Sequence, residues 1–367
     1  MRRRVRYMLK SEKCDTQYDK VRSSVYMIWM ISIILLFSVG CAQKNNSVDL
    51  YVDAVMLREL NENEKAIEKL NAAIQLNNRF SLAYSLLGDI YQELRDYEKS
   101  ATAYEKAAKL NPWSFKDFFN LGRVYQIMRR FERAARAYVR ACELKPNHLE
   151  AHINTAKCFY EIKDYDRALV YGERARQINP NAIEIQEMLG DIYELRQDYG
   201  QAIRLYKRAL EINSNNPKIM TSLALAYLKT NCSSLAEELL TSVVRIQPDN
   251  GTAYQYLGYC YLQFYDQAVK SYKRLLEIDS SDAADLASLK ENANEAVDKA
   301  IENYSRAIEI NNEDWQAYKG LGVAYMLRAL ESKDEELKAK ALQQWRLSLE
   351  HKADQPSLRK LIRHYSR

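Results

Sequence analysis

The chain has 367 residues, of which 47% are hydrophobic and 28% charged, and it contains only 10 glycines and 6 prolines. This composition argues against a disordered chain. The net charge of +5 lies in residues 1–40, which hold eight basic and three acidic residues, so the remainder is neutral. Residues 41–367 therefore lack the excess of basic residues that is typical of nucleic-acid-binding proteins, and we expect no nucleic-acid partner.

The first predicted element is a signal sequence over residues 1–40. A basic stretch precedes an uncharged apolar run over residues 25–41, which ends in small residues before Cys41. This order is typical of a secretory signal. The run is short for a membrane span, which needs about 20 apolar residues. Residues 41–46 would then form a lipidated cysteine and a short polar tether.

The residues Ser38-Val39-Gly40-Cys41 resemble the lipobox of bacterial lipoproteins. In that family the cysteine receives a diacylglycerol and the chain is cut just before it, so the resemblance implies lipidation of Cys41. Ala42 after the cysteine resembles the sorting rule for the outer membrane. The alternative is an uncleaved anchor helix, and Met8 is an alternative start. Both interpretations attach the protein to a membrane and place the rest of the chain in the periplasm or otherwise outside the cytoplasm.

A period of 34 residues dominates the rest of the sequence. A small residue recurs at this interval, and an aromatic residue follows each one by three positions. The small residues are Gly88, Gly122, Ala156, Gly190, Ala224 and Gly258. The aromatic residues are Tyr91, Tyr125, Phe159, Tyr193, Tyr227 and Tyr261. A period of this length indicates one supersecondary unit that is copied along the chain.

Each copy contains two apolar stripes of helical period, separated by a short polar turn. In residues 115–148, Gly122 and Tyr125 lie on the first stripe, and Ala134 and Tyr138 lie on the second. The small residues allow two helices to approach closely. Pro146 ends the second helix and opens the next copy.

This pattern resembles the tetratricopeptide repeat, and it runs without insertion from residue 81 to residue 250. The resemblance implies an all-α fold, a right-handed superhelical solenoid of about nine helix-turn-helix units. We predict regular repeats over 47–282, irregular repeats over 283–354 and a capping helix over 355–367.

The irregular part departs from the pattern at three places. The inner turn of 251–282 is two residues short, and 283–297 would form a poor first helix. The turn of 315–354 carries about seven extra residues, which we interpret as a charged loop. Residues 356–367 follow as a short amphipathic helix with Arg359, Lys360 and Arg363 facing outward.

The sequence offers no motif for catalysis, cofactor binding or a metal. His148 and His152 are four residues apart but lack an acidic or cysteine partner at ligand spacing, which favours structural histidines. The six cysteines show no paired or metal-ligand spacing. We interpret Cys158 and Cys260, which hold equivalent positions, as buried thiols, with a Cys142–Cys158 disulfide as an open alternative. We predict no cofactor and no enzymatic activity.

The predicted binding surface is the concave wall that, in tetratricopeptide-repeat proteins, is lined by the outward residues of each first helix. It reads acidic over 81–114, basic and amide-rich over 115–182, acidic again over 183–216, and then aliphatic and aromatic at Leu225, Leu228, Tyr256 and Tyr259. The predicted peptide-binding residues are Phe119, Asn120, Arg123, Asn154, Lys157 and Tyr160. Asn120 and Asn154 hold equivalent positions, which resembles the asparagine ladder by which some members of the family hold a peptide backbone.

Three functions follow as hypotheses. The first is a membrane-tethered scaffold for envelope assembly that binds a peptide or helix of another protein in this groove. The second is an accessory protein that recruits peptidoglycan or polysaccharide enzymes. The third is an enzyme whose acidic residues Glu187, Asp191 and Glu194 form an unrecognised site. The sequence leaves the partner and the oligomeric state open.

Overall fold

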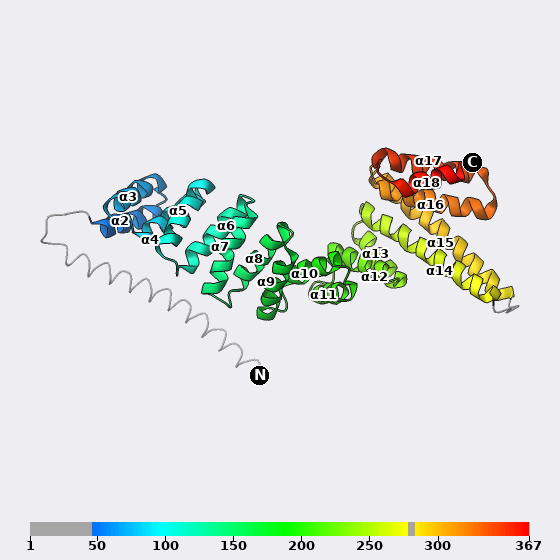
Figure 1. Ribbon diagram of the computed structural model, residues 1–367, viewed down its shortest axis with the longest axis horizontal. Coiled ribbons are helices and arrows are strands. Elements are labelled where there is room, and N and C mark those ends of the chain that lie inside the picture. Colours follow the sequence, from blue (N-terminus) through cyan, green and yellow to red (C-terminus); the bar gives the residue numbers. More distant parts are fainter. Residues whose placement is uncertain (1–45, 278–282, 367) are drawn as a thin grey trace, which may run out of the picture. The chain divides into compact units, whose positions relative to one another are not determined.

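The computed structural model describes residues 46–277 and 283–366. The predicted signal sequence and Cys41 lie outside the described residues. The described residues form 17 α-helices and no strand (Figure 1). The predicted all-α repeat solenoid is therefore confirmed. None of the helices in these two ranges is long and apolar enough to cross a membrane.

The described residues divide between Pro112 and Trp113 into two compact bodies, which were not anticipated from the sequence. The amino-terminal body contains α2 (Ser47–Glu59), α3 (Asn63–Leu76), α4 (Ser81–Glu93) and α5 (Tyr97–Leu110). The carboxy-terminal body begins with α6 (Phe115–Ile127), α7 (Phe131–Leu144), α8 (Leu149–Glu161), α9 (Tyr165–Ile178), α10 (Ile183–Leu195), α11 (Tyr199–Ile212), α12 (Pro217–Lys229) and α13 (Ser233–Ile246). It ends with α14 (Gly251–Glu277), α15 (Ala283–Ile310), α16 (Trp315–Ser332), α17 (Glu335–His351) and α18 (Pro356–Tyr365).

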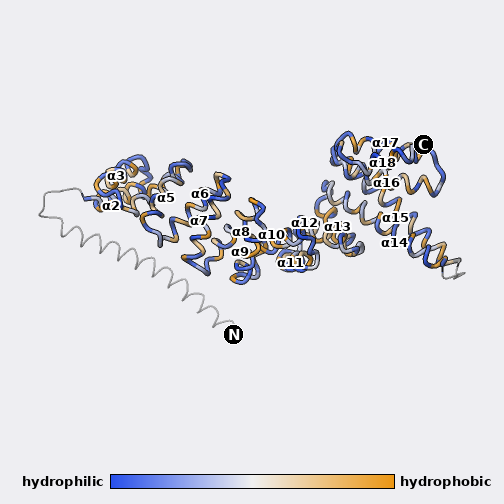
Figure 2. Tube along the Cα trace, viewed as in Figure 1, coloured by the Kyte–Doolittle hydropathy of each residue, from blue (hydrophilic) through white to orange (hydrophobic). Residues whose placement is uncertain are grey.

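Each even-numbered helix from α2 to α16 pairs with the odd-numbered helix that follows it to form one repeat. We call the two members the first and second helix. Hydrophobic and hydrophilic residues alternate along these helices (Figure 2). The buried face of a repeat consists of alanines and a few large side chains, such as Tyr104, Tyr138 and Tyr206, each with no exposed surface. Small residues therefore let neighbouring helices approach, and the large rings fill the remaining space.

The turn inside each regular repeat contains a residue with left-handed backbone conformation. These residues recur every 34 positions and none is glycine. They are Asn61, Arg95, Arg129, Lys163, Gln197 and Asn231, with φ between 57° and 62°. In three repeats the following aspartate then caps the second helix, as when Asp198 accepts a hydrogen bond from the Gln201 backbone nitrogen at 3.2 Å. Both features stop the first helix and start the second within three residues.

The structure corrects the predicted division of residues 251–314 into two repeats. Helix α14 runs without a turn from Gly251 to Glu277, and α15 runs from Ala283 to Ile310. A Cβ atom on Gly258 would lie 2.8 Å from the ring of Tyr304. In regular repeats the ring that packs against this glycine belongs to a tyrosine only 16 positions after it, whereas Tyr304 lies 46 positions after Gly258. Residues 251–314 are thus one repeat whose two helices are extended into a long hairpin. The described helices form eight repeats, one fewer than predicted.

The last repeat also differs from its prediction. The extra residues of 315–354 do not form a loop, because they lengthen both α16 and α17, which join at Lys333 with φ 56°. Trp345 packs against Gly322, in the place of the recurrent tyrosine. Helix α18 follows and buries Leu358 against Trp345 and Ala341. Its residues Arg359, Lys360 and Arg363 are exposed.

Candidate binding surface on the first helices

The six predicted binding residues lie on the first helices α6 and α8, but they do not share one environment. Phe119 is only 9% exposed, and its ring stacks on Phe115 at 5.4 Å between centroids and meets the edge of Tyr138 at 5.6 Å. Phe119 is therefore a core residue that offers little surface to a ligand, which corrects its prediction as a groove residue. The other five remain at least partly exposed. We call the outward surface of α6, α8, α10, α12 and α14 the first-helix wall.

Asn154 contacts a tyrosine from the second helix of the preceding repeat. Its side chain hydrogen-bonds the hydroxyl of Tyr138, which itself donates to Gln126 Oε1 at 2.9 Å. Burial is the main reason that the pKa of Tyr138 is raised, so this hydroxyl is a stable neutral donor. The predicted ladder position thus belongs to a network of amides and a hydroxyl on the wall.

Lys157 and Tyr160 connect α8 to the next repeats. The Lys157 ammonium lies 2.5 Å from Glu184 Oε2 on α10. Burial raises the pKa of Tyr160, and the nearby Asp191 carboxylate raises it further. The basic part of the predicted wall is consequently continuous with the acidic part, since the two meet between α8 and α10.

The acidic residues of α10 surround the hydroxyl of Tyr206. This hydroxyl lies 2.7 Å from Asp191 Oδ1 and 3.1 Å from Glu194 Oε2. Burial raises the pKa of Asp191 and of Glu194 above the usual carboxyl range, and the Tyr206 hydrogen bonds partly offset the increase. Glu187 forms an ion pair with Lys218 of α12. The arrangement places two partly desolvated carboxylates on one donor, and α12 of the adjoining repeat adds Lys218 near Asp191 and Lys229 near Glu194.

A groove on the wall continues from these carboxylates across α12 to α14. Its cavity has a volume of about 510 Å³. Glu194 lies at one end, Ser222 and Leu225 line the middle, and Tyr256 lies at the other end. Leu228 is 1% exposed and belongs to the core, contrary to its predicted place on the wall. From α10 to α14, the groove therefore presents the Glu194 carboxylate, the Ser222 hydroxyl and the apolar surface of Leu225 and Tyr256.

The hydroxyls of Tyr138 and Tyr206 on the wall, and that of Tyr104 in the amino-terminal body, were not anticipated from the sequence, which predicts these three tyrosines as core residues. Their rings are buried, yet each comes from a second helix and passes a glycine of the first helix. A Cβ atom at Gly88, Gly122 or Gly190 would come within 2.7 Å of the ring or closer. The hydroxyl then reaches polar residues of the first helix, such as Asp89 at 2.6 Å from Tyr104. The sequence pattern that predicts this contact is a glycine on the first helix, followed by a polar residue one or four positions later and by a tyrosine 16 positions later.

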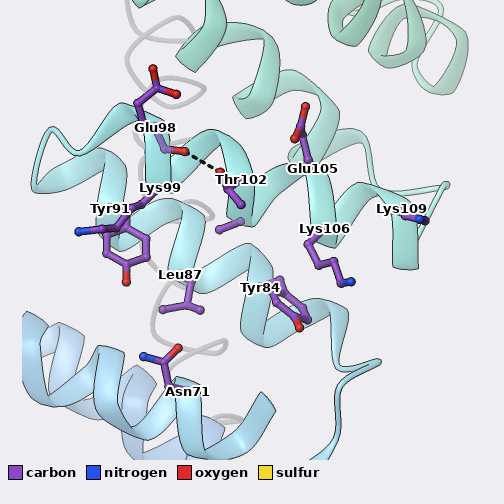
Figure 3. Close-up of a pocket in the computed structure, with 11 residues that line it drawn as sticks. Asn71, Tyr84, Leu87, Tyr91, Glu98, Lys99, Thr102, Glu105, Lys106 and Lys109 are labelled. Atoms are coloured by element: carbon purple, nitrogen blue, oxygen red, sulfur yellow. Dashed lines mark hydrogen bonds between the residues drawn. The ribbon is translucent and has the colours of Figure 1, made fainter. Parts of the chain in front are cut away.

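A cavity of the amino-terminal body lies on the side of the second helices. Figure 3 shows it between α3 and α5, with Tyr84, Leu87 and Tyr91 of α4 at its base and Lys99 and Lys106 along α5. The Lys99 ammonium lies 5.4 Å from the centre of the Tyr91 ring. The volume is about 600 Å³.

An equivalent cavity of about 430 Å³ recurs in the carboxy-terminal body, between α7 and α9. Phe159 and Arg167 occupy the places of Tyr91 and Lys99, and the guanidinium lies 4.3 Å from the ring centre. Such cation–π pairs stabilise a fold by about 0.5–1 kcal/mol at exposed sites. The cavities on this side are therefore a recurring feature of the repeat.

His152 and three of the four described cysteines, Cys142, Cys158 and Cys260, are buried, whereas Cys232 is exposed. His152 is 6% exposed, its Nε2 lies 3.0 Å from the carbonyl oxygen of Pro146, and burial lowers its pKa. Gln186, one repeat later, donates to the Pro180 carbonyl in the same way at 2.8 Å. Cys142 and Cys158 are free, and burial raises the pKa of Cys158 to about 12. The described residues contain no cluster of three or more metal-ligating side chains.

Comparison with known families identifies the repeat. A family described as "TPR repeat" matches residues 55–95 and 190–231, and families described as "Tetratricopeptide repeat" match residues 81–112 and 119–183. The chain contains tandem tetratricopeptide repeats. Repeats of this kind typically form interaction scaffolds without enzymatic activity.

Solved structures share the fold at low sequence identity. The carboxy-terminal part of a tetratricopeptide-repeat protein from Cytophaga hutchinsonii aligns with a TM-score of 0.52 and 12% identity, covering 74% of this chain and 97% of that one. YrrB, described as a TPR protein with an unusual peptide-binding site, aligns with a TM-score of 0.46 and 18% identity, covering 50% and 95%. MamA aligns with a TM-score of 0.43 and 20% identity, covering 45% and 90%. A comparison with curated proteins gave no match.

Proposed function

We propose that this tetratricopeptide-repeat protein is a non-enzymatic scaffold that binds an extended segment or a helix of another protein on its first-helix wall. The observation that carries the proposal is the continuity of polar groups from α6 to α14. Asn154 and Lys157 are followed by the carboxylates of Asp191 and Glu194 and then by Leu225 and Tyr256. A peptide backbone needs both donors and acceptors, and this surface supplies both.

The charges of the wall define the partner that fits it. Lys157–Glu184 is an exposed ion pair between successive repeats, and such a pair is worth little, so a ligand can replace it. In the Lys218–Glu187 pair only the lysine is exposed, because the Glu187 side chain is 17% exposed. Asp191 and Glu194 share one hydroxyl and are partly desolvated. We expect the bound segment to present a cation or several N–H donors at α10. Past α12 it would present an apolar side chain to Leu225 and Tyr256.

We also propose that the protein acts in the cell envelope, where it is tethered to a membrane. The proposal rests on the basic stretch, the uncharged run over 25–41 and Cys41, which precede the repeats by a few residues. Lipidation at Cys41 would place the repeats in the periplasm, at the outer membrane. Globomycin treatment or Cys41→Ser should then change both electrophoretic mobility and membrane partition. Unchanged mobility and partition would contradict lipidation.

Capture in native membranes tests the binding proposal. Tagged full-length protein is crosslinked, and the captured proteins are identified by mass spectrometry. The same capture uses a wall variant in which Asn120, Arg123, Asn154 and Lys157 are changed to Ala. We expect a partner that is captured by the wild type and lost from this variant. A partner with assembly functions would support the scaffold, whereas captured cell-wall enzymes would support the recruiting role.

A matched variant controls for general effects of four substitutions in the same repeats. Its changes to Ala lie at exposed positions of the second helices α7 and α9, namely Glu132, Arg136, Arg174 and Gln177. We expect this variant to capture the same partner as the wild type. Loss of the partner from the control but not from the wall variant would move the binding site to the second helices.

A further inference from the structure

One position of the repeat is completely buried in every repeat except the first. It lies on the first helix, two residues after the recurrent small residue. Its later occupants are Ile90, Val124, Cys158, Ile192, Ala226, Cys260 and Ala324, each with 0% exposure. Met56 holds this position in the first repeat and is 46% exposed. Val52 is also 37% exposed, while its equivalent Leu86 is 5% exposed.

The preceding repeat covers this position at Ile90, Ala226, Cys260 and Ala324. Ile90, for example, packs in one cluster with Ala54, Ala66 and Leu70 of the first repeat. Within the described residues, no helix precedes α2, so Val52 and Met56 lack this cover. The opposite end of the solenoid is closed, because α18 buries Leu358 against the last repeat. Terminal repeats of a solenoid require a polar outer face, and on α2 the exposed side chains of Val52 and Met56 interrupt such a face.

The exposed residues around Met56 carry negative charge. Asp49, Asp53 and Glu59 are exposed on α2 beside Val52 and Met56, and Asp53 also pairs with Lys69 at 3.2 Å. We define the α2 face as Val52, Met56 and these three acidic residues. Two α2 faces would place acidic residues against each other, which disfavours a contact between identical ends. The chemistry favours an amphipathic helix with an apolar residue among basic ones.

The chain itself ends in such a helix. The outer surface of α18 exposes Arg359, Lys360 and Arg363, and Leu361, which is 38% exposed, lies at the edge of this surface, about 100° from Lys360 around the helix axis. We define these four residues as the α18 face. We propose that the α2 face of one copy of this protein binds the α18 face of a second copy. This head-to-tail contact joins two different surfaces, so it can continue to further copies. It is independent of the proposed function of the first-helix wall.

Crosslinking between two differently tagged full-length proteins tests the contact. One protein carries Val52→Cys and the other carries Leu361→Cys, and a bismaleimide is added to the mixture in detergent. We expect a mixed dimer that neither single variant forms when it is mixed with the tagged wild type. A dimer formed by Val52→Cys alone would indicate contact between two α2 faces and would overturn the proposal. A crosslink within one chain, or none, would overturn it as well.

Charge reversal gives a second readout that does not depend on cysteines. In sedimentation velocity, the weight-average mass of the wild type should rise above the 42.8 kDa of one chain as concentration increases. Changing Arg359, Lys360 and Arg363 to Glu should return the mass to that of one chain. Combining this variant with a second protein in which Asp49, Asp53 and Glu59 are changed to Lys should restore association of the mixture. A failure of this rescue would contradict charge pairing between the two faces.

A matched control addresses the apolar part of the contact. Met56→Glu should abolish self-association. Leu82→Glu places the same charge at a leucine of α4 that is 53% exposed and lies outside the α2 face. This control should associate as the wild type does. Equal effects of the two substitutions would show that added charge, rather than loss of the α2 face, dissociates the protein.

Discussion

The ring of Tyr206 lies directly against Gly190, and its hydroxyl donates to Asp191, the residue next to that glycine, at 2.7 Å. One side chain of a second helix thereby fills the core and also places a donor on the first-helix wall. The same arrangement occurs with Gly88 and Tyr104. Packing and surface chemistry are therefore coupled in these repeats, and several measurable consequences follow from the coupling.

We predict that Gly190→Ala lowers the free energy of unfolding by about 1–3 kcal/mol, the usual cost of an extra methyl group in a filled core. The new Cβ atom would lie 2.5 Å from Tyr206 Cε1. An ordinary helical glycine shows the opposite effect, since alanine is the better helix former by about 0.5–1 kcal/mol. Gly200 is a suitable control, because its Cβ would meet only Asp198 Oδ1 at 3.7 Å. Urea denaturation followed by circular dichroism should show opposite shifts for the two variants.

The loss of stability caused by Gly190→Ala should be smaller when a smaller side chain replaces the Tyr206 ring. The repeat formed by α12 and α13 already combines alanine and leucine at these places, Ala224 and Leu240, and both are fully buried. We expect the double variant Gly190→Ala with Tyr206→Leu to be more stable than the sum of its two single variants. A double-mutant cycle measures this coupling. Strict additivity would show that the steric account of the glycine is wrong.

We predict that Tyr206→Phe destabilises the protein by about 1.5–3 kcal/mol, the range for hydrogen bonds to charged groups. The substitution keeps the ring against Gly190 but leaves Asp191 and Glu194 without their shared donor. Tyr193→Phe, in the same repeat, serves as the control for loss of a phenolic hydroxyl and should have a smaller effect. Equal losses of stability in the two variants would refute a special role of the Tyr206 hydroxyl.

The stability of the repeat that contains α10 should fall as the pH rises through the carboxyl range. Burial raises the pKa of Asp191 and of Glu194. A carboxyl group with a higher pKa in the folded chain binds more protons when folded, so its contribution is present below its unfolded pKa and is lost as the pH rises through its folded pKa. Asp191→Asn combined with Glu194→Gln should remove this dependence.

Urea denaturation at a series of pH values, from below pH 4 to neutrality, checks that expectation. The stability of the double variant relative to the wild type should increase as the pH rises. Parallel profiles for the two proteins would contradict the raised pKa values.

We predict that the distal part of the α14–α15 hairpin can be removed without loss of the fold. Deletion of residues 264–293 joins Gln263 to Asn294 and places Tyr304 16 positions after Gly258, as in a regular repeat. Glu295→Gly would then suit the left-handed turn position, and Ala296→Asp would cap the second helix. Circular dichroism should show a helical protein that still unfolds cooperatively. A deletion variant that is unfolded would show that the hairpin is integral to the repeat.

Much of the fold could be predicted because helix packing depends on the spacing of small and large residues, which the sequence displays directly. The 34-residue interval of Gly88, Gly122 and Gly190 predicts the helix pairs from α4 to α13. The hairpin was missed because periodicity finds only elements of the expected length. Residues 259–277 contain no glycine or proline, so α14 continues where the pattern predicts a turn, and Tyr304 rather than Tyr272 reaches Gly258.

The candidate site was less predictable than the fold, because exposure depends on neighbouring side chains. Phe119 has the position of a wall residue, but Phe115 and His148 cover its ring. The hydroxyl of Tyr206 reaches the wall only because α10 and α11 meet at a glycine. Such a contact joins two helices, and the periodicity of one helix alone does not reveal it.

Site-specific photo-crosslinking in cells tests most directly the claim that the first-helix wall binds another protein. A photoreactive amino acid replaces Asn154 of α8 or Ser222 of α12 on the wall, and Arg136 of α7 or Arg204 of α11 on the second helices. We predict that both wall positions crosslink the same protein and that neither position of the second helices does. Crosslinks to that protein from the second helices alone would contradict the account, and so would the absence of crosslinks at both wall positions.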